Sequence, residues 1–273
     1  MPPRAGSLIV MALTTILAAG PAMGLERGQS ARQTQPVVIE LYTSQGCSSC
    51  PPADSLLSEM IRNNPKLIAL TLPVDYWDYI GWKDTLASPT FTARQKAYAA
   101  TRSDHHIYTP QAVVNGVSHV VGSDRDEIEA ASRATFGKDG ALSVPMTANP
   151  HDNGLSVDLG AAPQGAPHEG SFWLFQIARE RTVTIGRGEN SGNKVTYANV
   201  VRQIKKIGTW MGKPVHFEIP GQELTSADSD SWVLILQAGS ERKPGPILAA
   251  LSGDQIKLSR SGKSPCGPSP GGA

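Results

Sequence analysis

Two cysteines, Cys47 and Cys50, are separated by two serines and lie between an apolar run and a helical pattern. The thiolate is the form of cysteine that attacks a disulfide, and a helix N-terminus favours it through free N–H groups and a partial positive charge. Cys47 is therefore expected to be the nucleophile and the more exposed sulfur. Cys50, one turn further on, is expected to be buried and to resolve a mixed disulfide. This chemistry needs no bound cofactor.

Two other uses of the cysteine pair stay open, namely an inert disulfide and a metal site. The chain has only three cysteines, and Cys266 lies in a Gly/Pro/Ser-rich stretch, so a disulfide-stapled scaffold is excluded. A copper site would need a further soft or imidazole ligand. His105, His106 and His119 are available, but their spacing matches no ligand signature, and no metal is predicted.

Two further positions have residue types that suit thiol–disulfide exchange. Glu40 interrupts an apolar run seven residues before Cys47, and a buried carboxylate there is a candidate to exchange a proton with Cys50. Pairing with an arginine, or exposure to water, is the alternative. Thr109 and Pro110 precede a predicted hairpin. A cis proline at this point would bring backbone against the cysteines and offer hydrogen bonds to an extended substrate.

Residues 75–90 are rich in aromatic side chains, although only 6% of the chain is aromatic. Tyr76, Trp77 and Trp82 follow a predicted strand at the sheet edge where Cys47 is expected. They are candidates for a peptide-binding surface, and local packing is the alternative interpretation.

The pattern around these residues predicts a β-α-β unit with a parallel sheet. Residues 37–42 and 67–74 are apolar strands, and between them a helix begins at Pro51. A second helix is predicted over residues 92–102. Asn115-Gly116 joins two β runs and is a strong hairpin signal. Ser123 or Asp124 can then cap a last helix that ends near residue 136.

The remaining sequence has a pattern of short strands that predicts a β-rich, sandwich-like domain over residues 143–255. One helix is expected, over Asn199–Ile207. Six short strand-like runs lie between Gly, Pro, Asn and Asp residues, at Val144–Thr147, Leu155–Leu159, Phe172–Ala178, Thr182–Ile185, Val215–Ile219 and Trp232–Gln237.

The two ends of the chain are expected to lie outside the fold. Residues 1–24 contain Arg4, an apolar run and a small-x-small site, which is the plan of a secretory signal peptide; an uncleaved anchor is the alternative. We therefore expect a periplasmic or secreted protein with no membrane span after cleavage. Residues 256–273 are expected to be disordered.

The formal charge of +1 gives no case for nucleic-acid binding. The oligomeric state stays open.

Five motifs resemble a family of secreted bacterial proteins called DUF1223, within the thioredoxin superfamily. They are Glu40–Asp54 (ELYTSQGCSSCPPAD), Val74–Trp82 (VDYWDYIGW), Tyr108–Gln111 (YTPQ), Arg187–Asn190 (RGEN) and Tyr197–Arg202 (YANVVR). The resemblance implies an α/β fold, with a thioredoxin-like domain at residues 36–140 that contains the aromatic insert. It also implies a cis Pro110 near the cysteines and a redox role. It does not imply a substrate.

Two functions follow from these expectations. The first is an exported thiol–disulfide oxidoreductase that acts on protein or small-thiol disulfides. The second is a non-enzymatic binding module or copper-handling protein in which the cysteine pair is structural or binds the metal. No tryptophan precedes Cys47, and Ser48-Ser49 replaces the inner pair usual in thioredoxins, so the redox potential stays open.

Overall fold

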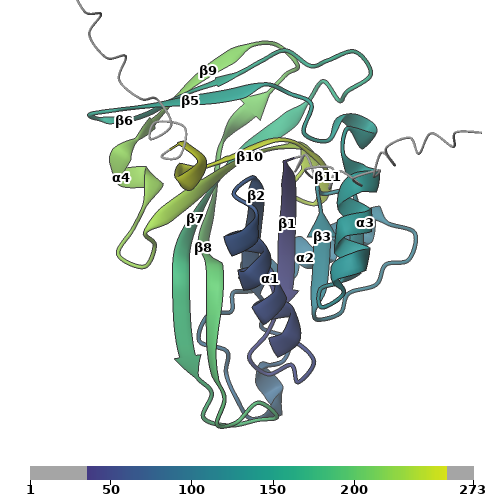
Figure 1. Cartoon of the computed structure of the whole chain (residues 1–273). Helices are drawn as coiled ribbons and strands as arrows, with labels where there is room; N and C mark the ends of the chain where they lie inside the picture. The colour runs from purple at the N-terminus through teal and green to yellow at the C-terminus, as the bar shows by residue number, and fades with distance from the viewer. Residues whose placement is uncertain (1–35, 257–273) are drawn as a thin grey trace, which may run out of the picture. The chain divides into compact units, whose positions relative to one another are not determined.

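The computed structural model describes residues 36–256, and a mixed eight-stranded sheet dominates it (Figure 1). Strands β1 and β2 run parallel, as do β2 and β8, whereas the other neighbours are antiparallel. The spatial order is β11 (Lys243–Ser252), β10 (Ser231–Ser240), β7 (Gly170–Thr184), β8 (Lys194–Trp210), β2 (Leu67–Pro73), β1 (Val37–Thr43), β3 (Gln111–Val114) and β4 (Ser118–Val121).

The predicted β-α-β unit is confirmed by β1, α1 (Pro51–Asn63) and β2. The two other predicted helices are also present, as α2 (Pro89–Thr101) and α3 (Arg125–Thr135). The Asp124 side chain accepts a hydrogen bond from the backbone N–H of Glu127 at 2.9 Å, so Asp124 is the cap of α3. Three further short helical segments are η1 (Asp78–Ile80), η2 (Lys138–Gly140) and α4 (Gly221–Leu224).

The Asn115-Gly116 turn joins β3 and β4 as predicted. Both residues have a positive φ, 53° and 69°, which is the conformation that the sequence pair favours. The Asn115 side chain is buried, accepts from the Val38 N–H at 2.8 Å and donates to the Thr135 hydroxyl at 3.0 Å. The turn therefore fixes both the register of the hairpin and the end of α3.

Each face of the large sheet carries its own packing partners, because side chains alternate along a strand. On one face, α2 packs over residues from β1, β2, β7 and β10. On the opposite face, α1 and α3 cover β1, β2 and β3. The far end of that face is covered by a three-stranded sheet of β5 (Met146–His151), β6 (Gly154–Leu159) and β9 (Val215–Pro220), which packs on β7 and β10.

The helix predicted over Asn199–Ile207 is wrong, because these residues belong to strand β8. Strand β8 pairs with β7 along most of its length and meets β2 at Thr71 and Val200. Two side-chain bonds support that junction: Thr71 donates to the Ala198 carbonyl at 2.6 Å, and Asn199 donates to the Ala69 carbonyl at 3.0 Å. Long-range pairing has overridden the local pattern.

The strands expected in a β-rich region from residue 143 are present, and β7, β8, β10 and β11 share a sheet with β1–β4. The domain boundary near residues 140–143 stays a prediction. Within residues 36–256, no helix is long and apolar enough to span a bilayer. The predicted signal peptide lies outside the described residues, as does the predicted tail except for Ile256, which is buried at the end of a helical turn.

Candidate functional site

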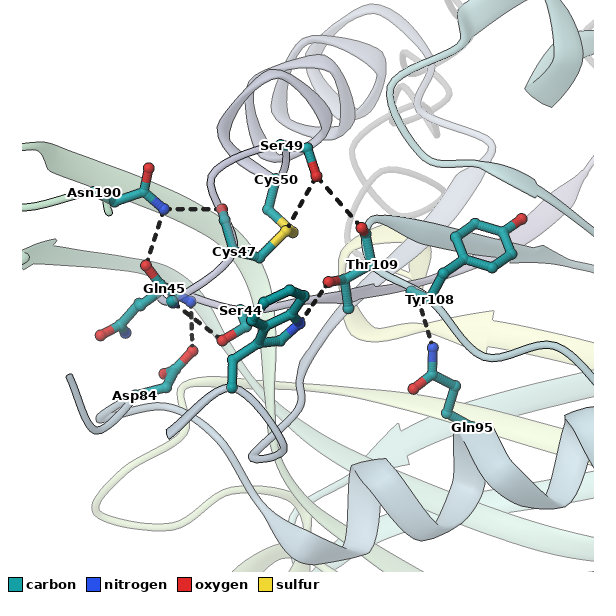
Figure 2. Close-up of a disulfide and its surroundings, with 12 residues drawn as sticks. Ser44, Gln45, Cys47, Ser49, Cys50, Asp84, Gln95, Tyr108, Thr109 and Asn190 are labelled. Carbon is teal, nitrogen blue, oxygen red and sulfur yellow. Dashed lines mark hydrogen bonds between the residues drawn. A yellow bond between two sulfur atoms is a disulfide. The ribbon is translucent and has the colours of Figure 1, made fainter. Parts of the chain in front are cut away.

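Cys47 and Cys50 form a disulfide at the turn between β1 and α1 (Figure 2). The Cα atoms are 5.4 Å apart, and Cys50 is the N-cap residue of the helix. The backbone N–H of Cys50 donates to the Cys47 carbonyl at 3.2 Å, which closes the turn. This Cα separation lies within the usual range for a disulfide.

The start of α1 has fewer free backbone N–H groups than the sequence predicts. Pro51 and Pro52 occupy the first helical positions and have no N–H group. The next two N–H groups, of Ala53 and Asp54, both donate to the Cys50 carbonyl, at 2.9 and 3.2 Å. The first N–H groups of α1 are therefore not available to stabilise a Cys47 thiolate. The contribution that the helix can still make is the partial positive charge at the start of its dipole.

Both cysteines are buried in the disulfide state, and the expectation that Cys47 is the more exposed and reactive sulfur stays a prediction. Cys47 is 1% exposed and Cys50 is 0% exposed. Asn190, at the tip of the β7–β8 hairpin, donates to the carbonyl oxygens of Cys47 and Gln45, at 2.8 and 3.0 Å. A chain segment 143 residues away in sequence therefore holds the cysteine loop (Figure 2).

The Ser49 hydroxyl connects the disulfide to the loop that contains Pro110. Ser49 Oγ lies 3.4 Å from the Cys47 Sγ and donates to the Thr109 carbonyl at 3.4 Å (Figure 2). The Thr109–Pro110 peptide bond is cis, as predicted. Gly122 lies against this proline, and a Cβ at position 122 would be 3.2 Å from Pro110. The structure therefore brings Cys47, Thr109 and Pro110 together.

The aromatic insert contributes polar contacts within the site. Trp77 Nε1 donates to the Thr109 hydroxyl at 2.8 Å, and Trp82 Nε1 donates to Gln45 Oε1 at 2.8 Å. Tyr76 is partly buried and packs against the core below. Tyr79, in contrast, is 80% exposed. These contacts favour local packing for the two tryptophans, and the substrate-binding role expected of Tyr76, Trp77 and Trp82 stays a prediction.

Glu40 lies in a different network, on the α2 side of the sheet. Its carboxylate accepts from Arg94 Nε at 2.6 Å and from the hydroxyl of Tyr98 at 2.5 Å. Gln237 of β10 joins the cluster through Arg94. Burial is the largest single effect on the pKa of Arg94 and lowers it, but Glu40 together with Tyr98 and Tyr42 raises that pKa above its usual value. No contact described within residues 36–256 joins Glu40 to the cysteines, so its proton-relay role stays a prediction.

Two buried acids near the cysteine loop were missed by the sequence analysis. Asp84 accepts from the backbone N–H groups of Gln45 and Leu86, both at 2.8 Å, and so holds the loop. Asp54 is 3% exposed and lies on α1 one turn after Cys50. A carboxylate on the buried face of a helix is unusual, and Asp54 stands beside the apolar residues Ala53 and Leu57, which was the available signal.

Two of the histidines considered as metal ligands, His105 and His119, form hydrogen bonds with other groups. His119 contacts Asp104 at 2.8 Å and the Tyr108 hydroxyl at 2.9 Å, whereas His105 contacts the Ala99 carbonyl. Within the part of the chain that the structure describes, no three His, Cys, Asp or Glu side chains are grouped as metal ligands.

Fold and site together define a mixed α/β protein with a buried Cys-x-x-Cys disulfide at a strand-to-helix turn. Residues 38–237 match the family described as "Protein of unknown function (DUF1223)", and the chain belongs to this family.

Two solved structures resemble the chain. The crystal structure of protein AGR_C_4864 from Agrobacterium tumefaciens has 32% identity and a TM-score of 0.70, and the match covers 81% of this chain and 95% of that one. HBP35 of Porphyromonas gingivalis has 11% identity and a TM-score of 0.54, and the match covers 86% of this chain and 80% of that one. The second similarity concerns the fold alone. No curated protein matches the sequence.

Proposed function

We propose that the protein is an exported thiol–disulfide oxidoreductase with a thioredoxin-like arrangement of its cysteine site. One observation carries the proposal: the Cys47–Cys50 disulfide lies at a strand-to-helix turn, and Ser49 joins it to the cis Thr109–Pro110 loop. A loop of this kind suits an extended disulfide substrate, whose backbone would replace the Ser49 contact at the Thr109 carbonyl. Export rests on the pattern of residues 1–24.

The reaction begins with the reduced protein. The Cys47 thiolate attacks one sulfur of a substrate disulfide, which forms a mixed disulfide and releases the other sulfur as a thiolate. Cys50 then loses its proton and attacks the Cys47 sulfur. The intramolecular disulfide forms, and the second substrate thiol is released. Run in reverse, the same steps oxidise a substrate dithiol, and no resident cofactor is required.

Trapping of the mixed disulfide tests this proposal. In a Cys266→Ser background, Cys50→Ser leaves Cys47 without its resolving partner. We expect incubation with glutathione disulfide, or with a peptide that contains one disulfide, to give a stable 1:1 adduct at Cys47, detected by mass spectrometry. Wild-type cysteines should give the intramolecular disulfide instead. The matched control is Cys47→Ser in the same background, which should form adducts at least about tenfold more slowly, because Cys47 is proposed as the nucleophile and Cys50 only as the residue that resolves the mixed disulfide.

One observation favours a second candidate, a binding module with a structural disulfide. Both cysteines are at most 1% exposed, and Asn190 and Trp82 hold the loop that carries them. Failure of Cys47 to form an adduct in a folded Cys50→Ser protein would favour this candidate over the oxidoreductase.

A further inference from the structure

Asp54 lies one helical turn after Cys50 at the start of α1. Cys50 has helical backbone angles, with φ −80° and ψ −36°, and Asp54 follows it four residues later, with its N–H donating to the Cys50 carbonyl at 3.2 Å. Side chains four residues apart lie on the same helix face, with Cβ atoms about 5–6 Å apart. The Asp54 side chain is therefore one turn from a sulfur that must gain or lose a proton.

The carboxyl group of Asp54 lacks the partners that an ionised carboxylate needs. Both oxygens are buried, and neither has a hydrogen-bond partner among the described residues. Burial is the largest effect on the pKa of Asp54, and it raises this pKa well above the usual value. The nearby Thr43 hydroxyl, which also lacks a partner in that part of the chain, lowers the pKa by a smaller amount, and the charge of Asp84 raises it.

The titratable groups that act on Asp54 come from two neighbouring segments. Asp84, at the end of the aromatic insert, is held by two backbone N–H groups. Tyr197, on β8, has its pKa raised by burial first and then by the charges of Asp54 and Asp84. Neither can neutralise an ionised Asp54, because Asp84 is itself an acid and Tyr197 carries no positive charge. The neutral acid is therefore the favoured form of Asp54 in the disulfide state.

Glu40, the acid expected from the sequence, has the opposite environment. Arg94 and Tyr98 both donate to its carboxylate, and Arg94 balances its charge. Arg94 and Tyr98 already engage both carboxylate oxygens of Glu40, and loss of its charge would leave Arg94 buried without its anion. Of Glu40 and Asp54, Asp54 is the one whose surroundings suit proton transfer, because its carboxyl group is buried without a cation beside it.

We infer that Asp54 is the proton donor and acceptor for Cys50 during disulfide exchange. When a thiolate attacks Cys47, a new S–S bond forms to Cys47 and the Cys47–Cys50 bond breaks, with its electron pair left on Cys50. The proton of the Asp54 carboxyl group moves to the Cys50 sulfur, which gives a thiol and a carboxylate. In the reverse step, the carboxylate takes this proton back, and the Cys50 thiolate attacks Cys47 and expels the thiolate. This inference rests on the proposed function.

The test is the pH dependence of disulfide reduction by dithiothreitol, with the rate divided by the concentration of its thiolate. For the wild type, we expect the normalised rate to be high at low pH and to fall as Asp54 loses its proton. Asp54→Asn preserves the shape of the side chain but has no acidic proton. We expect its normalised rate to be about 10²-fold lower at acidic pH and independent of pH. Asp54→Ala should give the same flat profile if the asparagine variant folds poorly.

Glu40→Gln is the matched comparison, since it removes the rival acid. We expect it to lower stability and to keep the wild-type pH profile. The inference is overturned if Asp54→Asn and Asp54→Ala keep that profile, or if Glu40→Gln flattens it. Because dithiothreitol reduces any accessible disulfide, this result is separate from the trapping experiment. Adducts at Cys47 together with an unchanged Asp54→Asn profile would uphold the oxidoreductase and reject the role of Asp54.

Discussion

Asn190 Nδ2 lies 2.8 Å from the carbonyl oxygen of Cys47, so the tip of the β7–β8 hairpin is part of the cysteine site. The same amide nitrogen lies 3.0 Å from the Gln45 carbonyl. Gly186 and Gly188 precede Asn190 in the hairpin and lie against Trp82: a Cβ at position 186 would be 3.0 Å from the indole ring, and a Cβ at position 188 would be 3.4 Å from the Trp82 Cβ. The hairpin therefore stabilises the loop that positions the disulfide.

Removal of this amide should loosen the loop. We expect Asn190→Ala to lower the free energy of unfolding by about 1–3 kcal/mol, because two buried carbonyl groups lose their donor. The disulfide should also become easier to reduce. Urea unfolding and the rate of reduction by dithiothreitol measure the two effects. Asn193→Ala is the control, since the Asn193 side chain is exposed, and unchanged behaviour of Asn190→Ala would contradict this role.

The Ser49 hydroxyl should increase the reactivity of Cys47. It is 3.4 Å from the Cys47 sulfur, and Pro51 and Pro52 leave the helix terminus with fewer N–H donors. In a Cys50→Ser/Cys266→Ser background, we expect Ser49→Ala to slow alkylation of Cys47 by iodoacetamide about tenfold at neutral pH, because a hydrogen bond to a charged group is lost.

Ser48→Ala is the matched control for that measurement. Ser48 is exposed and adjacent in sequence, so its removal should leave the alkylation rate within about twofold of the parent protein. Equal rates for the two serine variants would show that the Ser49 hydroxyl does not act on the thiolate.

The buried pair of Glu40 and Arg94 should be a major determinant of stability. Arg94 is 9% exposed and Glu40 is fully buried, with Nε and Oε1 2.6 Å apart. We expect Glu40→Gln to lower the free energy of unfolding by about 3–5 kcal/mol, since the guanidinium is left buried without its anion. The double replacement Glu40→Leu/Arg94→Met should cost less than the sum of the single replacements. Additive losses in urea unfolding would contradict a direct pair.

The sequence predicted local features of the site better than its distant contacts. Hydrophobic periodicity and Asn115-Gly116 identified α1 and the β3–β4 hairpin, because those signals lie within a few residues. Asn190 and Arg94 could not be assigned to the site or to Glu40, since their partners are 143 and 54 residues away. The strand at Asn199 was missed for the same reason: pairing with β7 and β2 decides its conformation.

The stability of the folded protein should depend on pH through Asp54. Its pKa is raised on folding, so between the unfolded and folded pKa values the folded protein keeps a proton that the unfolded chain has lost. The contribution of Asp54 to the free energy of unfolding therefore falls as pH rises from about 4, by at most about 1.4 kcal/mol per pH unit. We expect Asp54→Asn to remove this slope and to gain stability relative to the wild type as pH increases.

Urea unfolding of the wild type and Asp54→Asn at matched pH values isolates this effect, because all other groups titrate in both proteins. The difference between the two free energies of unfolding should change steadily across the window and become constant above the folded pKa. A difference that is the same at every pH would show that Asp54 has an ordinary pKa in the folded protein.

The reduction potential of the Cys47–Cys50 disulfide is the most direct test of the redox role. Equilibration of a Cys266→Ser protein in glutathione buffers of graded ratio, followed by alkylation and mass spectrometry, gives the oxidised and reduced fractions. A redox-active pair should titrate within the range of known exchange proteins, about −270 to −120 mV. A pair that stays oxidised to below about −300 mV is a structural bond, and that result would contradict the proposed function.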